Sequence, residues 1–221
     1  MDYSNLLKGN MSERIIIVGA GGFGREVLWW LQEEFFGTDI GGFLSDDPDI
    51  LSGKDISVPI LGTVDSYEVQ EGDLFVIAIG NIAAKKAVSE RLIAKGAKFT
   101  TFIHNTALVS KTAKIGEGCI IGPYSIVSDH AVISDFVMFS FYASCGHDAV
   151  IGKYSILSPY ATVNGFVVLG DEVFMGTHSS VAAKRTVGNN SMISSGSAAM
   201  YDVPDHCFVV GVPGKSQVIF S

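Results

Sequence analysis

A histidine–aspartate pair, His147-Asp148, is the first candidate for chemistry in this sequence of 221 residues. An imidazole can accept a proton near neutral pH, and a neighbouring carboxylate can fix its tautomer or raise its basicity. His147 is therefore our candidate general base, with Asp148 as its partner. The alternative is a hydrated surface histidine with no catalytic role.

Cys145 lies two residues before His147 and offers a competing chemistry, because a cysteine near a histidine can act as a thiolate nucleophile. The repeat described below instead places Cys145 and Cys119 in an inward-facing register. A buried thiol has a raised pKa and low reactivity, so we expect both to be core residues. No His/Cys spacing in the sequence is typical of a metal site, and no metal is expected.

A glycine-rich segment, residues 19–24, is the second candidate site and fits the pattern G-x-G-x-x-G. An apolar run at 15–18 predicts a buried strand before it, and residues 25–36 predict an amphipathic helix after it. Glycines let the backbone approach a phosphate, which the N–H groups of the helix start can bind. A tight strand–helix turn without a ligand is the alternative. The predicted nucleotide-sugar contacts here are Gly19, Gly21, Gly22 and Phe23.

An acidic pair follows the next apolar run of this segment. Asp46 lies 22 residues after Gly24, near the distance at which dinucleotide-binding folds place a ribose carboxylate. Asp46 and Asp47 are therefore candidates for nucleotide binding, or else they cap a turn. A strand at 74–79, a helix at about 83–95 and a strand at 98–102 complete one α/β unit. A dinucleotide needs two such halves, which argues against NAD.

The rest of the chain has a period of six residues. From Val109 to Ala199 every sixth residue is apolar, sixteen in one register, and the residue two positions earlier is usually small. This period is typical of a hexapeptide parallel β-helix. Three hexads close a triangular coil of 18 residues, with the large aliphatic side chain inside. The small residue after it is expected to permit the corner.

Composition agrees with this organisation and excludes several classes of protein. The chain is 48% hydrophobic and 17% charged, with a net charge of −8 and no run of Lys and Arg. These values exclude a disordered chain and argue against a nucleic-acid binder. No apolar segment approaches the roughly 18 residues of a membrane span. Three cysteines and no recognisable signal peptide suggest the cytoplasm.

These segments together resemble the hexapeptide-repeat acyltransferases. More narrowly, the chain resembles the bacterial sialic-acid O-acetyltransferase and nucleotide-aminosugar N-acetyltransferase family. The resemblance covers about residues 13–216. It rests on the repeats and on five segments, which are 16–27, 42–47, Ile79-Gly80-Asn81, Gly146-His147-Asp148 and 211–215.

The resemblance implies a lead-in at 1–12, a Rossmann-like nucleotide-sugar-binding domain at 13–104, a left-handed β-helix at 105–203 and a tail at 204–221. It also implies a homotrimer with acetyl-CoA in the cleft between neighbouring prisms. The low charge of the prism independently suggests that partner chains cover part of its surface. The resemblance adds Gly80 and Asn81 to the nucleotide-sugar contacts and Gly165 to the pantetheine site. Lys184 and Lys215 are candidates for the CoA phosphates, or else solvated lysines.

Two positions depart from the family pattern. Ile156 stands where many members carry a second histidine, and Ser140 where many carry an asparagine. The predicted reaction is acyl-CoA-dependent N-acylation of a nucleotide-linked amino-deoxysugar, in which His147 takes the proton as the amine attacks the thioester directly. O-acetylation of a sugar such as sialic acid and a non-catalytic nucleotide-sugar-binding scaffold are the alternatives. A dehydrogenase is a distant third.

Overall fold

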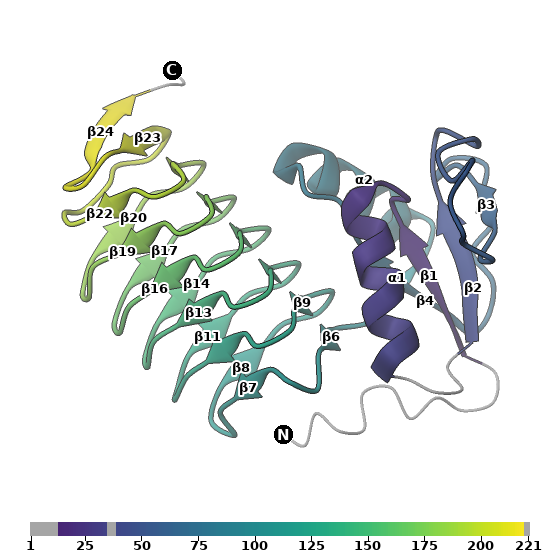
Figure 1. The fold of residues 1–221 in the computed structure, drawn as a ribbon, viewed down its shortest axis with the longest axis horizontal. Coiled ribbons are helices and arrows are strands. Elements are labelled where there is room, and N and C mark those ends of the chain that lie inside the picture. Colours follow the sequence, from purple (N-terminus) through teal and green to yellow (C-terminus); the bar gives the residue numbers. More distant parts are fainter. Residues whose placement is uncertain (1–12, 35–38, 219–221) are drawn as a thin grey trace. The chain divides into compact units, whose positions relative to one another are not determined.

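The computed structural model describes residues 13–34 and 39–218, which form two compact units divided between Thr100 and Thr101. Each unit is described by itself (Figure 1). The expected lead-in, the end of the first predicted helix and the last three residues of the expected tail lie outside the described residues.

The N-terminal unit is a parallel sheet with the strand order β3-β2-β1-β4-β5. The central strand β1 is buried, as expected for a continuous apolar run between two neighbouring strands. The short Rossmann-like sheet predicted from the sequence is therefore confirmed. Its elements are β1 (Arg14–Val18), α1 (Gly22–Glu34), β2 (Asp39–Leu44), β3 (Ile60–Gly62), β4 (Asp73–Ile77), α2 (Ile82–Ala94) and β5 (Lys98–Phe99).

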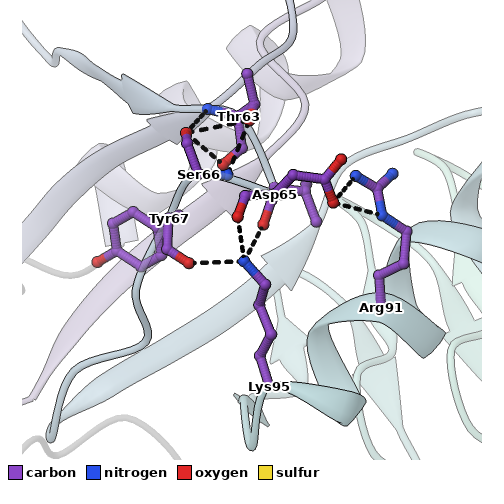
Figure 2. A network of polar contacts seen from close by, with 7 residues as sticks. Thr63, Asp65, Ser66, Tyr67, Arg91 and Lys95 are labelled. Atoms are coloured by element: carbon purple, nitrogen blue, oxygen red, sulfur yellow. Dashed lines mark hydrogen bonds and ion pairs between the residues drawn. The ribbon is translucent and has the colours of Figure 1, made fainter.

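Hydrogen bonds connect the end of α2 to the loop that follows β3 (Figure 2). The Lys95 ammonium donates hydrogen bonds to three carbonyl oxygens, those of Val64, Asp65 and Tyr67, at 2.8, 2.5 and 3.0 Å. The Arg91 guanidinium donates to Asp65 Oδ1, and this hydrogen bond lowers the pKa of that carboxyl. Both cations thus hold the helix to the loop.

The second unit is a parallel β-helix built from two-residue strands that recur every six residues from β6 to β22. From β6 to β19, each strand pairs in parallel with the strand 18 residues further on, as Val127 does with Cys145. The predicted β-helix of 18-residue coils is therefore confirmed, and Figure 1 shows the coils stacked along one axis. The first sheet contains β7 (Leu108–Val109), β10 (Ile126–Val127), β13 (Ser144–Cys145), β16 (Thr162–Val163), β19 (Ser180–Val181) and β22 (Ala198–Ala199).

The other two sheets complete the triangular section. The second sheet contains β8 (Lys114–Ile115), β11 (Val132–Ile133), β14 (Val150–Ile151), β17 (Val168–Leu169) and β20 (Thr186–Val187). The third contains β6 (Phe102–Ile103), β9 (Ile120–Ile121), β12 (Met138–Phe139), β15 (Ile156–Leu157), β18 (Phe174–Met175), β21 (Met192–Ile193), β23 (Cys207–Val210) and β24 (Lys215–Val218).

The predicted inward register forms the core of the prism. From Ile121 to Ala199 every residue of that register is buried, and Val109 and Ile115 pack partly buried at its first end. Two serines at the small inward positions donate hydrogen bonds to the backbone of the prism: Ser125 to the Ser140 carbonyl at 2.9 Å and Ser155 to the Gly170 carbonyl at 3.1 Å. The period of six therefore predicted the core correctly.

The prism corners contain a feature that the sequence did not reveal. Every sixth residue from Tyr124 to Asn190 has a left-handed φ of 54–62°. In non-glycine residues this conformation costs roughly 1 kcal/mol or more each. The N–H of each corner bonds to the previous coil, as Tyr142 does to the Pro123 carbonyl at 2.9 Å. The corner residues therefore form regular columns, one above another along the solenoid.

The boundaries of the β-helix differ from the expected ones. The strand predicted at 98–102 is divided, because Phe99 pairs with β4 whereas Phe102 pairs with β9 of the solenoid. The Thr101 hydroxyl, which donates to the Gly116 carbonyl at 2.7 Å, begins this attachment. At the other end, the expected tail contains β23, parallel to β21, and β24, antiparallel to β23.

Candidate functional site

The sheet of the N-terminal unit brings the predicted nucleotide-sugar segments to one edge. Strands β2, β1 and β4 are adjacent and parallel, so their carboxyl ends lie side by side. The Gly19 N–H donates to the Leu44 carbonyl at 2.9 Å, and the Ala78 N–H donates to the Val18 carbonyl at 2.8 Å. The strand order reverses between β1 and β4, which is where open α/β sheets bind ligands.

The glycines of the β1–α1 turn have two different roles. A Cβ on Gly24 would lie 1.9 Å from the Gly19 carbonyl oxygen, and one on Gly19 would lie 2.9 Å from the Ala78 carbonyl oxygen. These two glycines allow the turn to close. A Cβ on Gly21 or Gly22 would meet nothing within 4 Å. Open space therefore lies beside the start of α1, where the first N–H groups have no acceptor within the helix.

Some of the remaining predicted contacts of this unit stabilise the fold, and others border open space. Asp47 accepts a hydrogen bond from the Asp49 N–H at 3.0 Å, so it caps a turn. Asn81 caps α2 by accepting from the Ala84 N–H at 2.9 Å. Phe23 packs its ring edge against Trp30. By contrast, Asp46 lines a cavity of about 640 Å³ bounded by the loop between β2 and β3, together with β3 itself.

Gly80, the last of these predicted contacts, also leaves room for a ligand. A Cβ added there would meet nothing within 4 Å. The open positions of this edge are therefore Gly21, Gly22 and Gly80, and Asp46 is the carboxylate among the predicted contacts that lines the cavity.

His147 lies at a prism corner with both ring nitrogens in defined positions. Its Nδ1 lies 2.9 Å from Asp148 Oδ2, and an added Cβ on Gly165 would lie 2.8 Å from its Nε2. Phe166 meets the imidazole edge-on at 5.0 Å. When Nδ1–H donates to Asp148, Nε2 carries the free lone pair. The structure thus brings together three predicted residues, His147, Asp148 and Gly165.

A second histidine–aspartate pair occupies the same corner one coil earlier. His130 Nδ1 lies 2.9 Å from Asp129 Oδ2, and the Asp148 N–H donates to the Asp129 carbonyl at 2.9 Å. The Thr112 hydroxyl also donates to Asp129. This hydrogen bond has the largest effect in lowering the pKa of that carboxyl, and the bond to His130 has the next largest. His130 is an exposed corner residue.

Cys145 is a core residue and is unsuited to nucleophilic catalysis. Its side chain is buried inside the prism, and burial raises the pKa of the thiol to about 12. Cys119 and Cys207 are also buried thiols. Among the described residues, no group of three or more His, Cys, Asp and Glu side chains could hold a metal ion.

The two departures from the family pattern have structural counterparts. Ile156 is fully buried in β15, where it pairs with Met138 and Phe174 of the adjacent strands in an apolar row. Ser140 is buried, with its carbonyl engaged by Ser125. Neither position supplies an imidazole or an amide near the candidate base.

Two cations lie further along the corner that carries His147. The Lys184 N–H donates to the Gly165 carbonyl at 3.0 Å, so Lys184 is one coil beyond Gly165. Its neighbour Arg185 was missed from the sequence. Arg185 occupies a position that is Ala149 and Val167 in the preceding coils, and its buried Nε has no hydrogen-bond partner among the described residues. A charged residue in the small-residue register was the available signal. Lys215 lies apart, exposed in β24.

Two comparisons with known proteins match parts of the chain. Residues 14–92 match the family model of the PglD N-terminal domain. A segment of 48 residues is 42% identical to serine acetyltransferases from Bacillus pumilus and Bacillus subtilis. That match spans only 22% of the length of each of those proteins.

Solved structures resemble the chain over nearly its full length. The acetyltransferase domain of PglB from Neisseria gonorrhoeae, in complex with acetyl coenzyme A, is 28% identical over 95% of this chain and all of that one, with a TM-score of 0.82. WeeI from Acinetobacter baumannii is 25% identical over 93% of this chain and all of that one, with a TM-score of 0.83. PerB from Caulobacter crescentus, with CoA and GDP-perosamine, shares the fold at 24% identity over 92% of this chain and 97% of that one (TM-score 0.84).

The chain is therefore similar to acyltransferases of solved structure over nearly its full length, as the resemblance to hexapeptide-repeat acyltransferases predicted. More narrowly, the N-terminal unit matches the PglD N-terminal domain family, and a neighbour in fold is a perosamine N-acetyltransferase. The predicted resemblance to bacterial sugar acyltransferases is therefore confirmed. Among the described residues, no helix is long and apolar enough to cross a bilayer.

Proposed function

We propose that the protein transfers an acyl group, with acetyl as the first candidate, from CoA to the amino group of a nucleotide-linked amino-deoxysugar. The observation that carries this proposal is the geometry of His147. Its Nδ1 is engaged by Asp148, while its Nε2 faces Gly165 at an exposed corner of a fold that is shared with acetyltransferases.

The reaction we infer is direct attack of the acceptor on the thioester. The amine nitrogen forms a bond to the acyl carbon while His147 Nε2 removes a proton from it. The C–S bond then breaks, and the imidazolium returns the proton to the leaving CoA thiolate. A positioned base of this kind contributes roughly 10²–10⁴-fold to the rate. Asp148 holds the imidazole in the required tautomer and stabilises its protonated form.

Gly165 fits the acyl-binding role for two reasons. Any side chain there would collide with the His147 ring, so glycine leaves room for the thioester beside Nε2. A Cβ on Gly146 would lie 2.5 Å from the Gly165 nitrogen, so glycine at 146 also keeps that N–H accessible. We assign this N–H to the oxyanion of the tetrahedral intermediate, which a positioned donor stabilises.

Lys184 and Arg185 are our candidates for the CoA phosphates. They lie two coils beyond the coil of His147 on the same corner, roughly 10 Å along the solenoid at the usual strand spacing. The unpartnered Arg185 Nε supports this assignment, because a buried cationic group needs an anionic or hydrogen-bonding partner. Lys215 is a weaker candidate, since nothing in the described structure relates it to this corner.

The N-terminal unit is proposed to hold the nucleotide sugar. Its phosphates would lie against Gly21 and Gly22 at the start of α1, with Gly80 and the cavity beside Asp46 nearby. The protein would act in the cytoplasm as a homotrimer, with acyl-CoA between neighbouring prisms. All three cysteines are buried thiols outside any disulfide bond, which is compatible with a reducing compartment.

Release of free CoA thiol tests this function directly. Acetyl-CoA is offered with a panel of nucleotide-linked sugars that carry either an amino or a hydroxyl group at the acceptor position. Thiol release that requires the amino group is the expected result. Release with the hydroxyl sugars would indicate O-acylation instead. Binding of both ligands without release would indicate a scaffold.

A further inference from the structure

A column of stacked aromatic rings runs along one corner of the prism. We call Tyr124, Tyr142, Tyr160 and His178 the Tyr–His ladder. Consecutive ring centroids are 5.0, 4.9 and 4.6 Å apart, and the ring planes are within 9° of parallel. Each residue follows the previous one by 18 residues, which is one coil, and each has a left-handed φ. The three tyrosines are 43–53% exposed.

The backbone of this column continues one coil beyond the last ring. The next corner residue is Gly196, with a φ of 68°. Its N–H donates to the Thr177 carbonyl at 2.9 Å, just as the His178 N–H donates to the Pro159 carbonyl at 3.0 Å. An added Cβ on Gly196 would meet nothing within 4 Å. The ladder therefore ends at an exposed imidazole, next to a position where a side chain is missing and space is open.

Another corner shows that such space is not a general consequence of glycine. Gly118 is a corner residue of another column and lies one coil before Phe136, whose ring stacks on that of Tyr154 at 5.1 Å. There an added Cβ would lie 2.6 Å from the Phe136 ring, so the neighbouring aromatic side chain already covers the glycine. Gly196 has no such cover.

We propose that the open end of the Tyr–His ladder is a stacking site for a planar heteroaromatic ring of a substrate, which lies on the His178 imidazole beside Gly196. Aromatic side chains bind bases in this way through their faces, largely independently of the identity of the base. An aliphatic or charged group would gain little from the face of an imidazole that is already stacked on its other side.

This inference rests on the proposed function, whose two substrates both carry such a ring. These rings are the adenine of acyl-CoA and the base of the nucleotide sugar. Gly196 is three coils beyond Tyr142, roughly 14 Å along the solenoid, and Tyr142 belongs to the coil of His147. In the proposed trimer, one prism can offer the His147 corner and its neighbour the ladder to the same cleft.

Binding measurements on the full-length protein test the site without using turnover. The ligands are CoA, 4′-phosphopantetheine, which lacks the adenine, and a nucleoside diphosphate. The variants are His178→Ala, which removes the last ring, and Gly196→Tyr, which fills the open position with a residue that adopts this corner conformation at three other coils. Gly196→Ala controls for backbone strain, and Tyr124→Ala removes a ring at the opposite end of the ladder.

We expect His178→Ala and Gly196→Tyr to lower the affinity for one ring-bearing ligand about tenfold. Their affinity for 4′-phosphopantetheine should not change, and Gly196→Ala and Tyr124→Ala should bind all the ligands as the wild type does. An effect on CoA assigns the site to adenine, and an effect on the nucleoside diphosphate assigns it to the base. Unchanged affinity for both ligands in folded His178→Ala and Gly196→Tyr would overturn the inference. Thiol release by the same variants would show that the proposed function stands regardless.

Discussion

At the scale of single residues, the surroundings of each reactive side chain decide which one is positioned to act. Two histidine–aspartate pairs occupy one corner in adjacent coils, with equal Nδ1–carboxylate distances of 2.9 Å. They differ in what lies beside them. His147 faces Gly165 and the edge of Phe166, whereas the Asp129 partner of His130 is shared with Thr112. The neighbouring glycine, more than the carboxylate, distinguishes the candidate base.

This difference predicts a selective effect of substitution. His147→Ala is expected to lower kcat by roughly 10²–10⁴-fold, because the proton acceptor is lost. CoA affinity should remain within about threefold, since the imidazole is not assigned to any CoA phosphate. His130→Ala is the matched control and should retain wild-type turnover. Steady-state thiol release and calorimetric CoA binding give both values. Equal losses in the two variants would contradict the assignment of His147 as base.

The buried Cys145 gives a prediction with a defined pH dependence. Burial raises the pKa of its thiol from an ordinary value near 9 to about 12, so the folded state favours the protonated form. Its contribution to stability is therefore complete below about pH 9 and is lost as pH rises towards 12. Urea unfolding at pH 8 and pH 10 should differ by about 1 kcal/mol more in the wild type than in Cys145→Ala.

Thiol reactivity and turnover provide an independent check on Cys145. In the native protein at pH 8, a disulfide reagent should react slowly with all three cysteines, which are buried. All three should react after unfolding. Cys145→Ala should still release CoA thiol from acetyl-CoA, whereas complete loss of turnover in a folded variant would revive the nucleophile hypothesis.

At the scale of elements, the β1–α1 turn separates folding from binding within one glycine motif. Gly24→Ala places a Cβ 1.9 Å from the Gly19 carbonyl oxygen and should lower the free energy of unfolding by about 1–3 kcal/mol. Gly21→Ala meets no neighbour within 4 Å and should leave that free energy nearly unchanged while weakening binding of a nucleotide sugar. Denaturant unfolding and calorimetry separate the two effects. A strongly destabilised Gly21→Ala would contradict this division.

The elements also show what the sequence could and could not predict. The inward register follows from a narrow prism that admits one large side chain per hexad, so the spacing alone identified residues such as Leu157 and Val163 as core. The left-handed corners were not predictable, because Tyr142 or Phe166 has no intrinsic preference for that conformation. Backbone bonds to the previous coil and ring stacking between coils stabilise it, and neither is visible in a single hexad.

The candidate sites were predicted to a similar extent. The motif spacing located His147, Asp148 and Gly165, and the structure brings them together. Spacing left open whether Asp47 binds a nucleotide or caps a turn, and it could not show that Asn81 caps α2, since capping depends on the local turn. Arg185 was not predicted as a binding residue, because the six-residue repeat identifies only the apolar and small positions.

At the scale of the whole molecule, exposed apolar side chains along the prism predict self-association. Five aliphatic residues in outward positions of the first and second sheets are 36–68% exposed, namely Leu108, Ile126, Val132, Val150 and Val168. The first two belong to the first sheet and the other three to the second, so they form two exposed rows, and exposed apolar rows of this kind mark an interaction surface. Sedimentation should give three times the chain mass of 23.5 kDa. Ile126→Glu should shift the species towards monomer, whereas Lys98→Glu, at an exposed position of β5 in the N-terminal unit, should not. A monomeric wild type at micromolar concentration would contradict the trimer.

The central claim is that this prism transfers an acyl group to a sugar nitrogen with His147 as base. The most direct measurement compares one nucleotide-linked amino-deoxysugar with its hydroxyl analogue, each offered with acetyl-CoA to the wild type and to His147→Ala. We expect the wild type to release CoA thiol and to form an N-acetylated sugar with the amino substrate but not with the hydroxyl analogue. His147→Ala should not do so at an appreciable rate. Undiminished acetylation by His147→Ala, or preferential acetylation of the hydroxyl analogue, would contradict it.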